Sequence, residues 1–299
     1  MSKRHATPIE RYRVEPGSHL RLRDLNPADD GGAEFAPLGA GSAKDGAAKF
    51  LAANRTELSH AQELLWASGT SAVLVVLQAM DAAGKDGTIK HVMSGVNPQG
   101  CEVHPFRRPS DSDLDHDFLW RYAQKVPGRG RIGIFNRSYY EEVLVVRAHP
   151  EILAAQRLPP GKRGRRFWQQ RFDDINHFEQ HLARSGTLIV KFFLNLSKAE
   201  QKRRLLERID TKDKRWKFSA ADAAERDYWD EYMRAYQDML RATSKRWAPW
   251  FVIPADHKYV ARALVAKILT SSIHALDLQY PKVSARDLRA ARRRLLGDR

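Results

Sequence analysis

Cysteine is nearly absent from this 299-residue sequence, in which Cys101 is the single one. A lone cysteine excludes an intramolecular disulfide framework and suits a reducing compartment. The sequence also lacks an uninterrupted apolar run of the ~20 residues that a membrane-spanning helix needs. Its N-terminal stretch, MSKRHATPIERYRVEPG, has no apolar core of a secretory signal. We therefore expect a soluble, cytoplasmic protein with no membrane partner.

Acidic residues are too few to balance the basic ones. The chain has 51 Lys and Arg against 36 Asp and Glu, a formal net charge of +15. Such an excess indicates a polyanionic partner, and charge alone leaves nucleic acid, a membrane surface and a phosphorylated substrate open. The alternative is a solvated basic surface, which we favour for the C-terminal run RDLRAARRRLLGDR, because its leucines indicate the end of an amphipathic helix.

Continuous apolar segments alternate with helix-sized stretches along the chain. We predict buried strands over 71–80, 131–136, 186–196 and 250–255, and a shorter one over 101–106. This pattern is typical of an α/β fold in which helices cover both faces of a mostly parallel, five-stranded sheet. Ligands of such sheets bind beyond the carboxyl ends of the strands, where Asp81 and Asn136 stand.

Composition divides the chain into three regions. Residues 1–45 are rich in Pro, Gly, Asp and Ala, and we expect them to form an extended or mobile arm. Residues 46–285 form the main domain, which opens with a helix over 46–68 that Gly69 ends. Residues 286–299 form a basic tail. Within the main domain, the lid segment (residues 197–220) is dense in Lys and Arg and suits a helical flap over anions.

The stretch DAAGKDGT, residues 81–88, follows the first predicted strand and precedes a helix expected from Thr88. A strand, a glycine-rich turn and a helix N-terminus make a phosphate-binding loop, because backbone N–H groups and the helix dipole point at the anion. In the pattern G-x-x-x-x-G-K-[ST], Gly84 and Lys85 match, whereas Ala79 and Asp86 depart from it. The predicted phosphate-binding residues are Ala83, Gly84, Lys85, Asp86, Gly87, Thr88 and Lys90. The alternative is an ordinary turn over GKDG.

Four side chains at the strand ends are candidates for the chemistry. Lys85 would reach the transferring phosphates as a mobile point charge. Asp81 can hold Mg²⁺ against phosphate oxygens or orient an attacking oxygen. Asn136 stands where phosphoryl-transfer folds often carry a metal-binding carboxylate, and alone it would be more typical of a cap or turn. Arg137 beside it favours the phosphate interpretation, because its fork of donors suits a phosphate group.

Several segments together resemble the type-2 polyphosphate kinases. They are DAAGKDGT (81–88), SGVNPQG (94–100), FNRSYY (135–140), VLVVR (143–147) and PADHK (254–258). The resemblance covers about residues 46–280 and implies a three-layer P-loop kinase fold with a flexible lid. It also implies that Mg²⁺, with Mn²⁺ as the alternative ion, supports transfer of the terminal phosphoryl group of inorganic polyphosphate to a nucleotide. The partners would then be polyphosphate, AMP, ADP and ATP, and not nucleic acid.

The resemblance implies roles for individual residues as well. Asp81 would organise the metal and the acceptor phosphate, and Lys85 would contact the phosphate chain. The implied polyphosphate-binding lid residues are Arg203, Arg204, Arg208 and Lys217. The implied nucleotide-binding residues are Gly95, Asn97, Arg108, Tyr140 and Arg147, with packing as the alternative for Tyr140 and plain surface exposure for Arg108. Related proteins form dimers or tetramers, so a homo-oligomer is expected by analogy.

Asn136 departs from many members of that family, which carry aspartate at this place. Asn or Glu there is associated with the class III subgroup, which accepts nucleoside monophosphates and diphosphates. A neutral amide repels a nucleotide phosphate less than a carboxylate does, so the acceptor could sit in more than one register. We therefore expect both AMP and ADP to be phosphorylated.

Two other functions compete with this interpretation. An ATP-dependent nucleoside monophosphate kinase would use the same loop chemistry, and dependence on the donor separates the two. A nucleic-acid-binding protein without catalysis would use the many Lys and Arg with the Trp and Tyr interleaved over 216–250. That interpretation leaves the loop at 81–88 without a purpose, because a stacking surface needs no phosphate loop.

Overall fold

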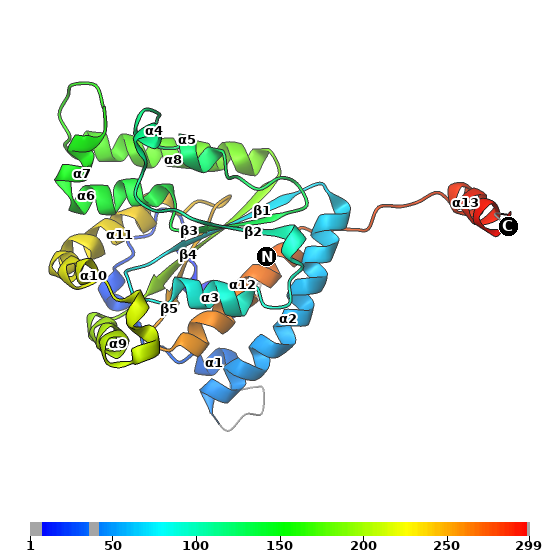
Figure 1. The fold of residues 1–299 in the computed structure, drawn as a ribbon, viewed down its shortest axis with the longest axis horizontal. Helices are drawn as coiled ribbons and strands as arrows, with labels where there is room; N and C mark the ends of the chain where they lie inside the picture. The colour runs from blue at the N-terminus through cyan, green and yellow to red at the C-terminus, as the bar shows by residue number, and fades with distance from the viewer. Residues whose placement is uncertain (1–7, 36–41, 298–299) are drawn as a thin grey trace, which may run out of the picture.

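A five-stranded sheet forms the centre of the protein in the computed structural model, which describes residues 8–35 and 42–297 (Figure 1). The strand order is β2-β3-β1-β4-β5, and every neighbouring pair is parallel. The strands are β1 Ala72–Gln78, β2 Cys101–Pro105, β3 Ile132–Asn136, β4 Thr187–Asn195 and β5 Trp250–Pro254. All five predicted strands are therefore confirmed.

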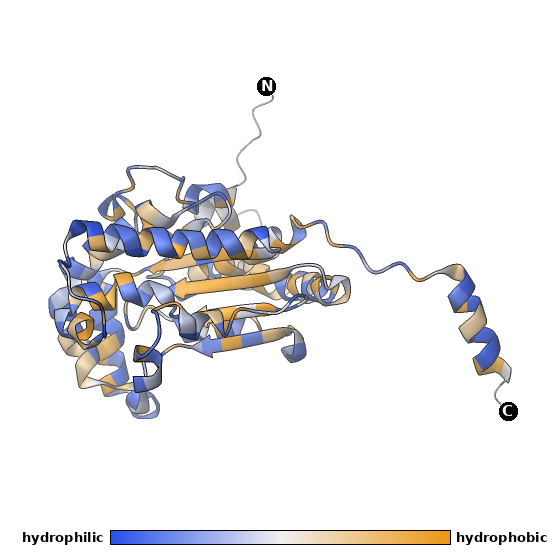
Figure 2. Ribbon diagram, turned by 90° about the horizontal axis from the view of Figure 1, so that it is seen from above, coloured by the Kyte–Doolittle hydropathy of each residue, from blue (hydrophilic) through white to orange (hydrophobic). Residues whose placement is uncertain are grey.

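Helices cover both faces of the sheet and complete three layers (Figure 1). Helices α2 (Ala43–Ser68), α3 (Lys85–Val92) and α12 (Lys258–His274) lie on one face, and α8 (Arg165–Arg184) and α11 (Trp229–Thr243) on the other. Alternate residues of β1 point to the two cores: Val73 and Val75 into the first, Leu74 and Val76 into the second. A strand buried on both faces needs this continuous apolar run, and Figure 2 shows the apolar strands enclosed by helices with polar outer surfaces.

The remaining helices lie between or beyond these layers. They are α1 Gly32–Phe35, α4 Asp111–Leu114, α5 Trp120–Ala123, α6 Val145–Ala148, α7 Pro150–Ala155, α9 Lys198–Asp210, α10 Ala220–Ala224 and α13 Ala285–Gly297. The 3₁₀ turns are η1 Pro8–Tyr12, η2 Leu22–Asp24, η4 Pro98–Gly100, η5 Tyr139–Val143, η6 Lys212–Lys217 and η7 Glu225–Tyr228. The lid segment thus contains α9, η6 and the first residue of α10.

Local capping sets the ends of α2. The Ser42 side chain accepts a hydrogen bond from the backbone N–H of Asp45, so the helix begins at Ala43, three residues before the predicted start. Gly69 ends the helix in the left-handed conformation, with φ 58°, and its N–H donates to Leu65 O. A residue with a Cβ would be strained there, which explains why glycine predicted this end correctly.

The N-terminal region, for which an extended or mobile arm over residues 1–45 is predicted, has little regular structure within residues 8–35 but packs on the main domain. Within residues 8–35, the side chains of Ile9, Tyr12, Val14, Leu22 and Phe35 are buried. The backbone N–H of Val14 also donates to Trp250 O at 2.9 Å, beside the last strand. Composition misled the prediction because a few apolar side chains, spaced between Pro, Gly and Asp, suffice to anchor a segment that has little regular structure. Residues 1–7 and 36–41 of the predicted arm lie outside the described residues.

Helix α13 stands away from the main domain at the end of an extended connection (Figure 1). Leu288, Leu295 and Leu296 are exposed on it, as the prediction of a solvated basic tail requires. Residues 298–299 of that tail lie outside the described part of the chain.

Across residues 8–35 and 42–297, the helices are too short or too polar to traverse a lipid bilayer.

Candidate active site

The turn between β1 and α3 forms the predicted loop. Helix α3 begins at Lys85, three residues before the expected Thr88, with Gly84 as its N-cap. Gly84 has φ 105° and Ala82 has φ 64°, so the chain passes through two left-handed residues to leave the strand and enter the helix. The first N–H groups of a helix lack intrahelical acceptors, so those of residues 85–87 are available to an anion beyond β1.

Asp81 and Arg137 lie at the carboxyl ends of the adjacent strands β1 and β3. Arg137 Nη2 donates to Asp81 Oδ1 at 2.9 Å. Burial opposes the charge of Arg137, but the carboxylates of Glu141 and Asp81 outweigh it and raise the pKa of the guanidinium. Arg137 also has φ 65°, a conformation that costs a non-glycine residue free energy and is found most often at functional sites.

The amine of Lys85 folds back onto the end of β1. Its Nζ donates to Ala79 O at 2.9 Å and to Met80 O at 3.5 Å. Burial beneath the loop lowers the pKa of Lys85, and the Asp81 carboxylate partly offsets this. A phosphate at the loop would offer this partly desolvated amine a charged acceptor in place of two neutral carbonyls.

Asn136 connects the end of β3 to the loop. Its Nδ2 donates to Asp86 Oδ1 at 2.7 Å, across fifty positions of the sequence. Asp86 is therefore held by a neutral partner at the mouth of the loop. This contact places the two residues that depart from the expected motifs, Asn136 and Asp86, directly against each other.

These residues line a cleft of about 740 Å³ at the carboxyl ends of β1, β2, β3 and β5. Nine of its lining residues are basic and four are acidic. The basic residues are Lys85, Arg107, Arg108, Arg137, Arg204, Arg208, Lys214, Lys258 and Arg262, and the acidic ones are Asp81, Asp86, Glu207 and Asp213. A cleft with this excess of positive charge raises the local concentration of polyanions.

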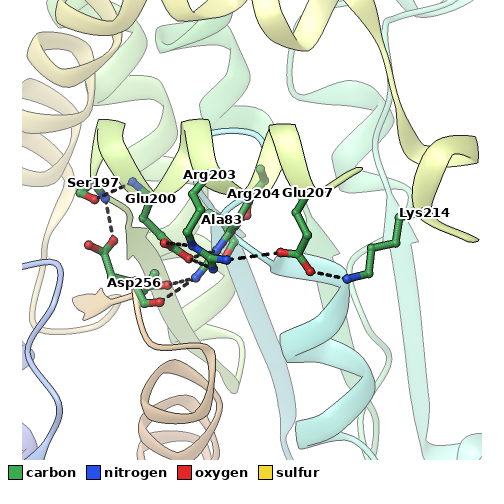
Figure 3. A network of polar contacts seen from close by, with 10 residues as sticks. Ala83, Ser197, Glu200, Arg203, Arg204, Glu207, Lys214 and Asp256 are labelled. Carbon is green, nitrogen blue, oxygen red and sulfur yellow. Dashed lines mark hydrogen bonds and ion pairs between the residues drawn. The ribbon is translucent and has the colours of Figure 1, made fainter. Parts of the chain in front are cut away.

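Helix α9 lies against the loop and forms one wall of the cleft (Figure 3). Ser197 caps the helix by accepting from the Glu200 N–H, and its own N–H donates to Asp256 Oδ1 at 2.8 Å. Arg204 is buried, 3% exposed, and its guanidinium contacts backbone carbonyls of the loop. The lid segment is therefore fixed to the loop at its N-terminal end.

The other predicted lid residues differ in their surroundings. Arg208 lines the cleft and forms an ion pair with Asp222 at 3.0 Å. Arg203 is exposed, pairs with Glu200 and Glu207, and lies outside the cleft lining. The side chain of Lys217 lies outside the described part of the structure. Of these four predictions, the geometry places Arg208 closest to its expected role.

Asp81 is the predicted metal-binding carboxylate, and it is one of four carboxylates that line the cleft. Among the described residues, no group of three or more His, Cys, Asp or Glu side chains is arranged to bind one. Mg²⁺ in phosphoryl-transfer sites needs no such group, because one or two carboxylates and the phosphates of the substrate complete its octahedral shell. The donor set of Asp81 with substrate phosphates therefore fits Mg²⁺.

Comparison with known proteins identifies the relatives of this fold and cleft. Residues 41–281 match the family described as Polyphosphate kinase 2 (PPK2). The chain belongs to the polyphosphate kinase 2 family. The match contains all five strands, the loop, α9 and α12, whereas the packed residues 8–35 and helix α13 lie outside it.

Individual relatives of the polyphosphate kinase 2 family agree with this assignment. An ADP-polyphosphate phosphotransferase from Rhodopseudomonas palustris is 54% identical over 228 residues, 76% of this chain and 79% of that protein. An AMP/ADP-polyphosphate phosphotransferase from Meiothermus ruber is 44% identical over 274 residues, 92% of this chain and 96% of that protein. The crystal structure of polyphosphate kinase 2 from Arthrobacter aurescens TC1 superposes with a TM-score of 0.84 at 39% identity, covering 95% of each chain. The predicted P-loop kinase fold is thereby confirmed.

Several residues with expected nucleotide roles lie away from the cleft of this polyphosphate kinase. Gly95 and Asn97 precede β2, at the amino-terminal edge of the parallel sheet, opposite the loop. Arg147 pairs with Asp238 of α11 at 2.8 Å and lies outside the cleft lining. Arg108 does line the cleft. The predicted phosphate-binding residues also differ among themselves. Residues 83–88 line the cleft, whereas the exposed Lys90, two residues further along α3, does not.

Tyr140 cannot contact a nucleotide in this structure, because it is fully buried. Its hydroxyl donates to Glu179 Oε1 at 2.8 Å and accepts from Lys191 Nζ at the same distance. Lys191 also donates to Glu179 Oε2 at 2.6 Å. The packing alternative for Tyr140 is therefore correct, and the prediction of a nucleotide contact is wrong. Tyrosine is amphipathic, so its sequence position alone did not separate stacking from a buried polar network.

Sequence reasoning missed several cations of the cleft. Lys258 and Arg262 stand four residues apart in the first turns of α12, directly after β5, and both line the cleft. Arg107 after β2 and Lys214 in η6 join them. The signal for Lys258 was present, because a helix N-terminus at a strand's carboxyl end was the feature used to identify the loop after β1. Glu141, which raises the pKa of Arg137, carried no such signal.

Proposed function

We propose that the protein transfers the terminal phosphoryl group of inorganic polyphosphate to AMP and to ADP in a reaction supported by Mg²⁺. Membership of the polyphosphate kinase 2 family and the names of its relatives as polyphosphate phosphotransferases support this donor. The observation that carries the proposal is the cleft itself, in which nine basic residues surround a phosphate-binding loop. A long, flexible polyanion needs such a track of cations more than a single triphosphate does.

The residues of the cleft suit an in-line phosphoryl transfer. A terminal phosphate oxygen of the nucleotide attacks the last phosphorus atom of the chain, the bridging P–O bond breaks, and the shortened chain leaves with its negative charge. Lys85, Arg137 and the N–H groups of the loop neutralise the charge on the equatorial and leaving oxygens. Asp81 would hold Mg²⁺, and the ion would supply positive charge that offsets the charge of the phosphates. Arg137 keeps the Asp81 carboxylate oriented through the contact at 2.9 Å.

Asn136 supports the use of both acceptors. Its amide holds Asp86 at 2.7 Å without adding a negative charge near the loop. In Asn136→Asp, two carboxylates would face each other at this distance, and the site would repel an acceptor phosphate more strongly. We expect the ratio of kcat/KM for AMP to that for ADP to change by at least about tenfold, since about 1.4 kcal/mol of differential interaction suffices. An unchanged ratio would remove Asn136 from the account of acceptor choice.

The decisive assay contains purified protein, Mg²⁺, long-chain polyphosphate and either AMP or ADP, without ATP. Formation of ADP from AMP and of ATP from ADP, followed by chromatography, is the expected result. Asp81→Asn should lower kcat at least about a hundredfold, the scale of one lost electrostatic contact in a transition state. If neither acceptor reacts until ATP is added, an ATP-dependent nucleoside monophosphate kinase replaces the proposal. Removal of divalent ions with EDTA, followed by Mg²⁺ or Mn²⁺ in turn, tests the metal.

Assembly and location complete the proposal. A homo-oligomer, dimer or tetramer, is proposed by analogy with the family, and light scattering coupled to size-exclusion chromatography measures it. A cytoplasmic location is proposed because one cysteine in 299 residues suits a reducing compartment.

A further inference from the structure

Arg204 has no hydrogen-bond donor left for a substrate, although it lines the cleft. Its Nη1 donates to Ala83 O at 2.8 Å and to Ala82 O at 3.2 Å. Its Nη2 donates to Ala255 O at 2.6 Å and to Asp256 O at 2.9 Å, and its Nε donates to Glu200 Oε1 at 2.7 Å (Figure 3). A guanidinium carries five N–H groups, and these five acceptors use all of them.

Gln201 extends the same set of contacts along the loop. This side chain is buried, and its Nε2 donates to Asp81 O at 3.0 Å. Its Oε1 accepts from Arg226 Nη1 at 2.7 Å, which fixes the orientation of the amide. Gln201 and Arg204 therefore bind the carbonyls of three consecutive loop residues, 81–83, from one side. We call these two side chains the α9 clamp.

The α9 clamp controls where the loop presents its N–H groups. A peptide group is planar, and its C=O and N–H point in opposite directions. The Ala83 carbonyl held by Arg204 therefore turns the N–H of Gly84, the N-cap of α3, away from α9. The clamp also binds the carbonyl of Ala82 through Arg204. Ala82 has a φ of 64°, which is unfavourable for a residue with a Cβ and persists only where surrounding contacts hold it.

We propose that Arg204 is a positioning residue of the phosphoryl-transfer site, which holds the phosphate-binding loop in its active shape and does not bind polyphosphate. The inference rests on the polyphosphate kinase activity proposed above, and it assigns Arg204 a different role from the exposed lid cations around it. It also locates the fixed part of the lid segment. The first two turns of α9 are fixed to the loop by these hydrogen bonds. Closure of the lid segment over a substrate therefore involves residues after Arg204.

Arg204→Lys separates positioning from charge. Lysine keeps the positive charge, but a single ammonium cannot reach four carbonyls on two chain segments. We expect kcat to fall about a hundredfold, the cost of a displacement of about 1 Å at a reacting group, while KM for polyphosphate stays within about twofold. Lys202→Gln is the matched control, since this neighbouring residue of α9 is exposed and lies outside the cleft lining. It removes one full charge and should leave both constants near wild type.

Two further measurements distinguish a positioning role of Arg204 from direct binding of polyphosphate, and neither depends on catalytic turnover. Hydrogen exchange of the peptide covering 79–88 should be faster in Arg204→Lys than in wild type or Lys202→Gln. Binding of long-chain inorganic polyphosphate, titrated at several salt concentrations, should show an unchanged slope of log K against log salt in Arg204→Gln. The slope should fall by about one in Lys85→Gln, because each lost phosphate contact releases one counterion fewer.

The outcomes separate the possibilities. If Arg204→Lys raises KM for polyphosphate with kcat intact, or if Arg204→Gln lowers the salt slope, Arg204 is a ligand and the inference is overturned. If loop exchange is unchanged, the α9 clamp does not hold the loop. If Arg204→Lys does not fold, Gln201→Met tests the same clamp through Asp81 O alone, and unchanged exchange and kcat there also overturn it. If wild type does not use polyphosphate at all, the proposed function fails, while loop exchange still tests the clamp.

Discussion

Lys85 and Lys191 show how burial gives two residues of one type different roles. Burial lowers the pKa of both, to about 8 for Lys191. Lys191 is enclosed in the sheet by Glu179, Tyr140 and the backbone of Thr243, so its donors are all used within the protein. Lys85 donates to two carbonyls at a strand end and lines the cleft. Lys191 therefore serves the fold, and Lys85 remains available to a phosphate.

The lowered pKa of Lys85 predicts an alkaline limit to activity. Because its pKa is lowered, the amine loses its proton at a lower pH than a free lysine, and the charged form is the one that binds phosphate. We therefore expect kcat/KM, which reports the free enzyme, to fall as pH rises toward the alkaline range. Lys85→Arg should shift this fall to higher pH, because a guanidinium stays protonated, even if the maximal rate is smaller. The same alkaline limb in both enzymes would mean that another group is responsible.

At the scale of elements, α9 serves two purposes within thirteen residues. Its first turns hold the loop through Gln201 and Arg204, and its last turn carries Arg208 over the cleft. The side chain of Glu200, in the first turn of α9, accepts hydrogen bonds from both Arg203 and Arg204. These hydrogen bonds, led by that of Arg203, lower the pKa of Glu200 to about 2 from 4.5.

The pKa of Glu200 makes the stability that these hydrogen bonds within α9 contribute depend on pH. A carboxyl group whose pKa is lower in the folded state stabilises that state above its unfolded value, and this contribution disappears as pH falls through the folded value. We expect the melting temperature of Glu200→Gln to lie below that of wild type at pH values above 4.5. The difference should shrink as the pH falls toward about 2. Thermal unfolding monitored by circular dichroism across this range tests it, and a difference independent of pH would contradict the assigned role of Glu200.

At the scale of the whole molecule, the two terminal regions contribute differently to the main domain. Residues 8–35 bury five apolar side chains against it and add a backbone hydrogen bond to Trp250. Helix α13 is exposed along its whole described length. Composition predicted an extended or mobile arm at one end and a solvated basic tail at the other, and it gave no signal that residues 8–35 pack on the main domain.

Truncation at the two ends should therefore have different effects on the free energy of unfolding. Removing residues 1–24 uncovers the sites of Ile9, Tyr12, Val14 and Leu22, each of which contributes about 1.5–3 kcal/mol when fully buried. We expect a large fall in the free energy of unfolding, measured by urea denaturation. Removing residues 284–299 should leave it unchanged within about 0.5 kcal/mol, the usual range for surface changes. Equal losses from the two truncations would show that α13 packs on the protein in solution.

The sequence by itself determined the features that depend on neighbouring residues. Five apolar runs specified the five strands, Gly69 specified the end of α2, and DAAGKDGT specified the loop at the end of β1. These predictions succeed because strand burial and left-handed turns are set by side chains within a few positions of one another, whereas the starts of α2 and α3 each lie three residues before the predicted position. The resemblance to type-2 polyphosphate kinases used the same local segments, and the family match confirmed it.

Only the tertiary structure decided which polar side chains reach the cleft. Arg203 and Arg204 are adjacent and chemically identical, yet one is exposed and the other donates to Ala83 O, 121 positions away. Tyr140 is enclosed by residues of α8 and β4, and Lys258 and Arg262 join the loop from the far end of the chain. Long polar side chains have no local rule for their partners, because those partners depend on which strand ends the sheet order brings together.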